Sequence, residues 1–236
     1  RTAGNPKPAA CRERPRRSWI FEFENFRGKK MELSGECKDI FEKTQRVGSV
    51  IVESGWVGFE RPGFAGEQFV LEKGEYPRWS TWTNCLSSYS LGSFRPLKVD
   101  SAEHKLHLFE NVGFEGRKMA IFDDDVPSLW AHGFQDRVAS AKAVNGTWVG
   151  YMYPGYRGRQ YVLEQGDFKH WNDWGATAPQ IQSVRRVRDM QWHKRGLKTK
   201  NTVPVNVLNR SVCHEVQILQ KYCMSLAWCF FKLGLE

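Results

Sequence analysis

The stretch Phe21–Gly28 reads FEFENFRG: an aromatic residue, a second aromatic five positions later, and a glycine two positions after that. The same pattern occurs as FERPGFAG at Phe59–Gly66, FENVGFEG at Phe109–Gly116 and YMYPGYRG at Tyr151–Gly158. A serine follows each copy by 21 to 27 residues and opens a short strand-like run. Four copies of one unit predict four copies of one supersecondary structure, because a repeat of this length forms one such element.

Each unit predicts a folded β-hairpin. Alternating aromatic and polar residues form the first strand, and the glycine permits the positive φ of a tight return. The second aromatic residue covers the hairpin, while the late serine bonds backbone groups that the hairpin leaves open. The predicted folded-hairpin residues are Phe21, Phe26, Gly28 and Ser49; Phe59, Phe64, Gly66 and Ser93; Phe109, Phe114, Gly116 and Ser140; and Tyr151, Tyr156, Gly158 and Ser183.

A strand, a folded hairpin and a returning strand form a Greek key, and the keys occur in pairs. FVLEKGEYPRWSTW at 69–82 returns as YVLEQGDFKHWNDW at 161–174, with six of fourteen positions identical, so the second half duplicates the first. The tryptophans three apart in each copy predict a short helical turn against the core. Two keys bury their faces together as a sandwich, so we predict an all-β chain with two such domains.

The predicted organisation follows from this spacing. It comprises a basic N-terminal arm at 1–17, a first domain at 18–97, a linker at 98–104, a second domain at 105–195 and a C-terminal extension at 196–236.

The four units in register, with LEKGEYPRW and DDDVPSLWAHGFQDRVAS, resemble the βγ-crystallins, and in detail the basic (B) subgroup of the beta-crystallins. The extension 196–236 departs from the family's pattern. The resemblance implies two βγ-crystallin domains in a refractive structural protein of the eye lens, without catalysis, cofactor or small-molecule substrate. It also implies cytoplasmic localisation in lens fibre cells, and assembly into homodimers and hetero-oligomers with other beta-crystallins.

Six aliphatic residues are candidates for a domain interface. Alignment of the two halves pairs them at offsets of 92, 92 and 90, and each is expected on a strand of a second key. They are either ordinary core residues or, as the resemblance implies, an apolar patch that joins two domains within one chain or between two chains. The pairs are Val57 with Val149, Val70 with Val162, and Leu97 with Val187.

The sequence predicts no enzyme and no metal site. Nucleophile-elbow, P-loop and zinc-protease motifs are absent from it. His104 and His107 are expected on the surface, on opposite faces of a strand, where they cannot share an ion. Asp123–Asp125 is expected to cap a short helix at VPSLW.

A calcium-binding βγ-crystallin module is the main alternative, because some domains of the family bind calcium through hard oxygen ligands. In the four corresponding places the fifth position, a ligand in the binding domains, is Gly48, Gly92, Ala139 or Gln182. The motif of the binding domains begins with two Asp or Asn residues, and of these only Asp136, in the third unit, is present. We therefore expect no tight calcium site.

A nucleic-acid-binding protein is the weaker alternative. The net charge is +9, but the basic residues gather in the two ends, which leaves 24 basic and 23 acidic residues in 18–195. VRRVR at 184–188 is locally basic, yet its charges alternate sides in a strand. The longest apolar run, CMSLAWCFF, is too short to span a membrane. Six cysteines without C-x-x-C spacing are typical of reduced thiols and the cytosol.

Overall fold

The computed structural model describes residues 17–83, 91–99, 103–134 and 137–188, all within one compact unit at 1–195. These described residues contain no α-helix, which agrees with the all-β prediction, and the four helices are short 3-10 turns. Residues 1–16 of the predicted arm and the whole predicted extension lie outside the described residues. The strands of the N-terminal half are β1 (Ser18–Phe23), β2 (Arg27–Leu33), β3 (Ser49–Val52), β4 (Trp56–Arg61), β5 (Ala65–Leu71), β6 (Gly74–Tyr76) and β7 (Ser93–Pro96).

The C-terminal half repeats this order with two differences in its first key. The short helix η2 (Val112–Phe114) forms the tip of its hairpin, and η3 (Leu129–His132) follows the second strand. The helices η1 (Trp79–Thr81) and η4 (Trp171–Trp174) occupy equivalent places in the two halves. The strands are β8 (Lys105–Phe109), β9 (Lys118–Phe122), β10 (Ser140–Asn145), β11 (Trp148–Tyr153), β12 (Arg157–Leu163), β13 (Gly166–Phe168) and β14 (Ser183–Arg186).

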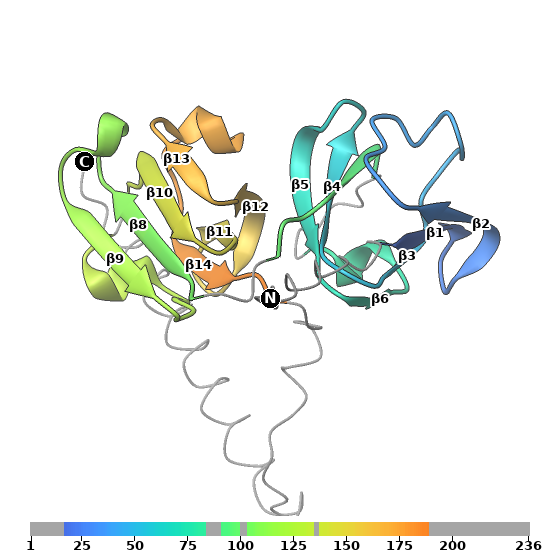
Figure 1. Cartoon of the computed structure of the whole chain (residues 1–236), viewed down its shortest axis with the longest axis horizontal. Coiled ribbons are helices and arrows are strands. Elements are labelled where there is room, and N and C mark those ends of the chain that lie inside the picture. Colours follow the sequence, from blue (N-terminus) through green and yellow to red (C-terminus); the bar gives the residue numbers. More distant parts are fainter. Residues whose placement is uncertain (1–16, 84–90, 100–102, 135–136, 189–236) are drawn as a thin grey trace, which may run out of the picture. The chain divides into compact units, whose positions relative to one another are not determined.

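The described residues form three antiparallel sheets (Figure 1). One has the order β2-β1-β3-β6 and its counterpart has the order β13-β10-β8-β9. The third sheet runs β14-β11-β12-β5-β4-β7, so strands of both halves belong to it. Its two parts meet at one antiparallel bridge, between Gln68 of β5 and Gln160 of β12.

The two keys of each half exchange strands. In the N-terminal half, β6 belongs to the second key by sequence but pairs with β3 of the first. In return, Cys37 from the first key bridges Phe94 on β7 of the second. In the C-terminal half, β13 of the second key likewise pairs with β10 of the first, and Val126 of the first key bridges Val184 on β14 of the second. Neither key is therefore complete without the other, which agrees with the prediction that a single key cannot bury its own face.

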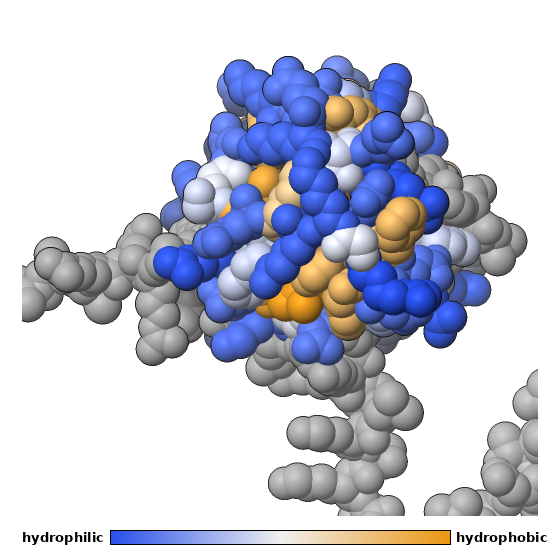
Figure 2. All heavy atoms as spheres, turned by 90° about the vertical axis from the view of Figure 1, so that its right-hand side faces the viewer, coloured by the Kyte–Doolittle hydropathy of each residue, from blue (hydrophilic) through white to orange (hydrophobic). Residues whose placement is uncertain are grey.

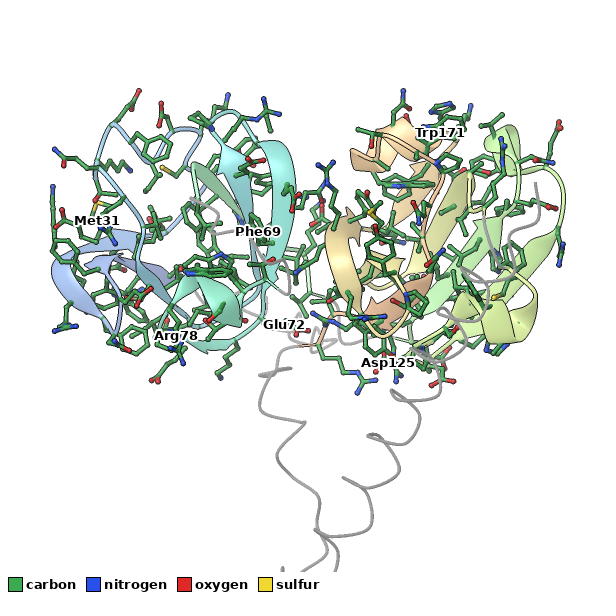
Figure 3. All side chains as sticks on the ribbon, turned by 180° about the vertical axis from the view of Figure 1, so that it is seen from behind. Met31, Phe69, Glu72, Arg78, Asp125 and Trp171 are labelled. Carbon is green, nitrogen blue, oxygen red and sulfur yellow. The ribbon has the colours of Figure 1, made fainter. Side chains whose placement is uncertain are left out.

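Each half has its own apolar core between its two sheets. Trp56 and Trp148 are fully buried at equivalent positions of the two cores. Phe69 on β5 points into the first core (Figure 3). Trp82 and Trp174 are also buried beside their 3-10 turns, which confirms that these tryptophans pack a short helical turn against the sandwich.

The hairpin backbone differs from the prediction in one respect. The four glycines of the pattern have φ between +76° and +83°, as expected. The aromatic residue two positions before each glycine also has a positive φ, and the sequence analysis did not foresee this. These residues are Phe26 (60°), Phe64 (61°), Phe114 (69°) and Tyr156 (60°). Because a bulky side chain rarely adopts this conformation, the surrounding structure must hold it there.

Substitutions at Gly63 and Gly66 of one hairpin can separate two costs of a side chain there, which are backbone strain at positive φ and steric overlap with neighbouring atoms. Both have a positive φ, but only at Gly66 would a Cβ meet a neighbour, 2.6 Å from Glu60 Oε2 and 2.9 Å from Glu60 Cβ. Gly63→Val is expected to cost about 1–3 kcal/mol in backbone strain alone. Gly66→Val is expected to cost about 1–3 kcal/mol more, from overpacking. Urea unfolding of the two variants measures the difference, and equal midpoints would contradict the role given to Gly66.

Candidate functional site

Four buried serine hydroxyls hold the four folded hairpins in the same way. Each serine is the first residue of a strand and is 0% exposed. Its Oγ accepts a hydrogen bond from the backbone N–H of the positive-φ aromatic residue and donates one to a carbonyl of the same hairpin. The accepted bonds are Phe26 N to Ser49 (2.9 Å), Phe64 N to Ser93 (2.9 Å), Phe114 N to Ser140 (3.0 Å) and Tyr156 N to Ser183 (3.1 Å). The carbonyls belong to Phe23, Arg61, Asn111 and Tyr153.

The two aromatic residues of each pattern pack on each other. Their ring centroids lie 5.5 to 5.7 Å apart in all four units, and the rings are inclined to each other by 56° to 69°. Edge-to-face contact of this kind adds about 0.5–1.5 kcal/mol to the burial of the rings. The structure thus brings together, within each unit, the four residues that the sequence pattern selected.

The six aliphatic residues proposed for an interface all lie in one buried cluster, separate from the two cores. Their exposed fractions are 0% to 6%, and Phe59 and Tyr151 complete the cluster. Leu97 and Val187 lie one residue beyond β7 and β14 rather than within a strand. Their backbone N–H groups still bond across to Gly55 and Thr147. Strands β4 and β5 are therefore buried on both faces, since Trp56 and Phe69 enter the core while Val57 and Val70 enter this cluster.

Two glutamines join the halves reciprocally beside this cluster. The side-chain carbonyl of Gln160 accepts from the backbone N–H of Val70, and that of Gln68 accepts from Val162, both at 3.0 Å. The amide of Gln68 donates to Trp174 O at 2.9 Å, and that of Gln160 donates to Trp82 O at 3.2 Å. The sequence analysis missed this pair, although an identical Gln lies two residues before Val70 and Val162 in both repeats.

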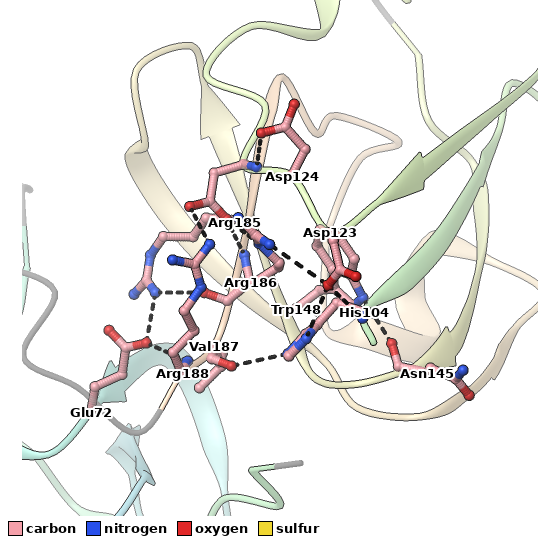
Figure 4. A network of polar contacts seen from close by, with 11 residues as sticks. Glu72, His104, Asp123, Asp124, Asn145, Trp148, Arg185, Arg186, Val187 and Arg188 are labelled. Atoms are coloured by element: carbon pink, nitrogen blue, oxygen red, sulfur yellow. Dashed lines mark hydrogen bonds and ion pairs between the residues drawn. The ribbon is translucent and has the colours of Figure 1, made fainter. Parts of the chain in front are cut away.

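Two ion pairs flank the cluster at equivalent positions. Arg185 Nη1 lies 3.0 Å from Glu72 Oε1, and both side chains are almost fully buried. Figure 4 shows this pair. In the second pair, Arg95 Nη1 lies 2.9 Å from Glu164 Oε2, and about a quarter of each side chain is exposed. Burial raises the pKa of the Glu72 carboxyl, although the charge of Arg185 opposes this. The loss of either member of the buried pair leaves an uncompensated charge, which is strongly destabilising.

The acidic run Asp123–Asp125 does not cap a helix, which corrects the prediction. Ser128 is the N-cap residue of η3, and no side chain there bonds the helix. Asp125 Oδ1 instead accepts from the backbone N–H of Arg186 at 2.9 Å and from its Nε at 3.0 Å (Figure 4). Asp125 Oδ2 accepts from Arg188 at 3.2 Å. The arginines of VRRVR are therefore paired with carboxylates and form no free basic face.

His104 is buried rather than on the surface, which corrects a second prediction. Its exposed fraction is 6%, its Nε2 lies 3.1 Å from Val187 O, and its ring meets Trp148 edge-on at 5.8 Å. The histidine therefore bonds the segment after β14 to the start of β8. His107 remains partly exposed on β8.

Among the described residues, no group of three or more His, Cys, Asp or Glu side chains is placed to hold a metal ion. The fifth calcium-motif positions have a common backbone role, since the N–H groups of Gly48, Gly92, Ala139 and Gln182 each donate to the first aromatic residue of their unit. Asp136 lies outside the described residues. In the part of the chain that the structure describes, no helix is both long and apolar enough to cross a membrane.

Comparison with known proteins gives consistent matches. A family model described as Beta/Gamma crystallin matches residues 18–97 and 105–187. Beta-crystallin B3 of Gallus gallus is 66% identical over 179 residues, which cover 75% of this chain and 85% of that protein. Beta-crystallin B1 of Sus scrofa is 57% identical over 196 residues, which cover 81% of this chain and 79% of that protein. A solved beta gamma crystallin from Ciona intestinalis is 34% identical, with 35% of this chain and 98% of that chain covered and a TM-score of 0.34.

The serine contact can be tested at Ser93. Ser93→Ala removes the acceptor of the Phe64 N–H and leaves that group without its partner inside the hairpin. We expect a loss of about 1–3 kcal/mol in the free energy of unfolding. Ser80→Ala changes an exposed serine in η1 and is expected to stay within about 0.5 kcal/mol of the parent. Similar losses in the two variants, measured by urea unfolding, would argue against the hairpin role of the serine.

The carboxylate of Asp125 predicts a pH dependence. Burial alone would raise its pKa, but the hydrogen bonds and charges of Arg186 and Arg188 outweigh burial, so the pKa lies below the ordinary 3.8. A depressed folded-state pKa contributes stability that is complete above the unfolded value and is lost as the pH falls through the folded value. The stability advantage of the parent over Asp125→Asn should therefore be constant above about pH 5 and shrink as the pH falls from about 5 to about 2.

Chemical denaturation across this range measures that advantage. Asp124→Asn is the matched control, because it removes one charge from the same loop at an exposed residue. If the parent remained as much more stable than Asp125→Asn at the lowest pH as at neutral pH, the charge of Asp125 would not be what stabilises its contacts with Arg186 and Arg188.

Proposed function

The chain belongs to the beta/gamma crystallin family as a structural protein of the eye lens and not an enzyme, and we propose that it supports transparency by pairing two domains through the buried cluster around Val57, Val70, Val149 and Val162. We place the domains at 18–97 and 105–195, joined by 98–104. The observation that carries the proposal is the reciprocal contact of Gln68 and Gln160 at the rim of that cluster.

The optical part of the proposal follows from composition and burial. The chain holds 15 Phe, 10 Trp and 7 Tyr, whose rings are strongly polarizable groups that raise the refractive increment. Many of these rings lie in the two cores or in the interdomain cluster. Dense packing inside a folded domain lets the protein carry these groups at high concentration without offering them to its neighbours.

The surface suits crowded solution. Hydrophilic residues cover most of the face in Figure 2, and hydrophobic residues gather in its lower middle, with smaller areas elsewhere. Two of the exposed aromatic rings have a cationic group over them: Arg46 lies 5.3 Å from the ring centroid of Phe23, and Lys105 lies 5.0 Å from that of Phe122. Such contacts shield apolar surface from other molecules.

Both edges of the sheet β2-β1-β3-β6 are protected against pairing with other chains. Edge strand β2 exposes Arg27, Lys29 and Lys30, and the opposite edge strand β6 has only three residues. Charged or very short edge strands are the usual means by which sheet proteins avoid aggregation.

We propose that the same surface forms the homodimers and hetero-oligomers with other beta-crystallins, in the cytoplasm of lens fibre cells. An apolar patch with a pseudo-twofold arrangement accepts an equivalent patch, whether it comes from the same chain or from a second one. The beta-crystallin relatives support this assignment of partners and place.

Val162→Asp tests the pairing. Val162 is 6% exposed inside the cluster, so a carboxylate there is buried without a partner. We expect the variant to lose association between domains, by at least about tenfold in the association constant, while both domains stay folded. Sedimentation and circular dichroism measure the two properties.

Val144→Asp is the matched control, because Val144 is 37% exposed on β10 and lies outside the cluster. Association that survives Val162→Asp unchanged would assign assembly to another surface. Unfolding of the second domain would make Val162 a core residue.

A further inference from the structure

Glu67 and Arg159 form an ion pair across the interdomain contact, beside the two reciprocal glutamines. Glu67 Oε1 lies 3.0 Å from Arg159 Nε, and the Glu67 side chain is 8% exposed. Each residue directly precedes one of the reciprocal glutamines on β5 and β12, whose pairing joins the two parts of the large sheet. The two residues are 92 apart, so they occupy the same place in the two repeats.

The other contacts of this surface use the same residue type in both halves. Gln68 corresponds to Gln160, and Glu72 to Glu164. Arg95 and Arg185 also correspond, since they pair with Val57 and Val149 in the two sheet parts. The flanking ion pairs therefore remain complementary if a half meets a copy of itself, because Glu72 would then face Arg95 and Glu164 would face Arg185.

Glu67 and Arg159 break this rule. They occupy equivalent places in the two halves but carry opposite charges. Two N-terminal halves paired in this geometry would place Glu67 against Glu67, and two C-terminal halves would place Arg159 against Arg159. Two like charges here repel each other, most strongly at Glu67, whose side chain is almost buried, whereas the observed opposite pair is favourable. Repulsion of unwanted partners is a common source of specificity where attractive contacts do not discriminate.

We infer that Glu67 and Arg159 make the pairing surface selective for an opposite half and exclude pairing of like halves. The partner that the N-terminal half accepts is thus a C-terminal half, of its own chain or of a second copy, with a cation at the position of Arg159. This inference rests on the proposed function, since it assumes that the cluster is the pairing surface.

Two full-length variants, Glu67→Lys and Arg159→Glu, test the selection when mixed, because neither has an opposite pair at this position within its own chain. The lysine introduced in the first variant can meet either of two carboxylates of the second. A contact with the unchanged Glu67 belongs to a pair of like halves. A contact with the introduced glutamate belongs to a pair of opposite halves.

A carbodiimide distinguishes these two contacts, because it joins an amine to a carboxylate that the amine touches. Mass spectrometry of the peptides then identifies which carboxylate is linked to the introduced lysine. We call the product with Glu67 the like-half link and the product with the introduced glutamate the opposite-half link. Arg159→Lys alone is the positive control, in which Glu67 should link to the new lysine.

If charge excludes like halves, both the like-half link and the opposite-half link appear in the mixture. The opposite-half link alone would show that shape excludes like halves, and would overturn the inference while leaving the pairing surface in place. The absence of both links, with none in the positive control, would overturn the proposed function as well. Glu75→Arg and Arg78→Glu, at exposed positions on and beside β6, repeat the charge changes away from the surface and should leave association unchanged.

The charge-swapped chain Glu67→Arg/Arg159→Glu gives the strength of the selection. Each single change should weaken pairing of the halves about fivefold, and the double change should restore it. High salt should reduce the effect, because this pair is partly open to solvent at Arg159. Failure of the double change to recover the loss would also count against the inference.

Discussion

The folded hairpin depends on one buried contact, in which a serine hydroxyl bonds the backbone of an aromatic residue at positive φ. The hydroxyl is one of the few groups that can both accept from an N–H and donate to a carbonyl at a single point. It thereby satisfies two backbone groups that the folded hairpin leaves outside any sheet ladder. Because the serine belongs to the last strand of its key, this contact also joins the end of the unit to its beginning.

Duplication of this unit explains how the halves pair. Strands β4 and β5, with β11 and β12, are apolar on both faces, so a core alone cannot bury them. Their outer faces meet around a pseudo-twofold axis and leave polar groups at the rim. Gln68, Gln160 and the two flanking ion pairs satisfy those groups, so the contact is specific as well as apolar.

The polar network around β14 connects the C-terminal half to this contact. Arg185 reaches Glu72 in the other half, Arg186 and Arg188 bind Asp125, and His104 meets the backbone of Val187 (Figure 4). Arg185 and Arg186, which are neighbours on β14, therefore face different partners, as the pleat of a strand requires. The arginines of a locally basic sequence are thus paired with carboxylates within the fold, which is consistent with a structural rather than a nucleic-acid-binding role.

The sequence by itself determined the all-β class, the four units, the tryptophan turns and the serines, because each depends on residues within one local pattern. The conformation of Phe26 and its equivalents was not predictable, since nothing in a sequence shows that tertiary contacts override a steric preference. The same holds for Asp125 and His104, whose partners lie 61 and 83 residues away. Only the tertiary structure decided which face of β4 and β5 enters the core, because an apolar strand that is buried on both sides carries no alternation to distinguish them.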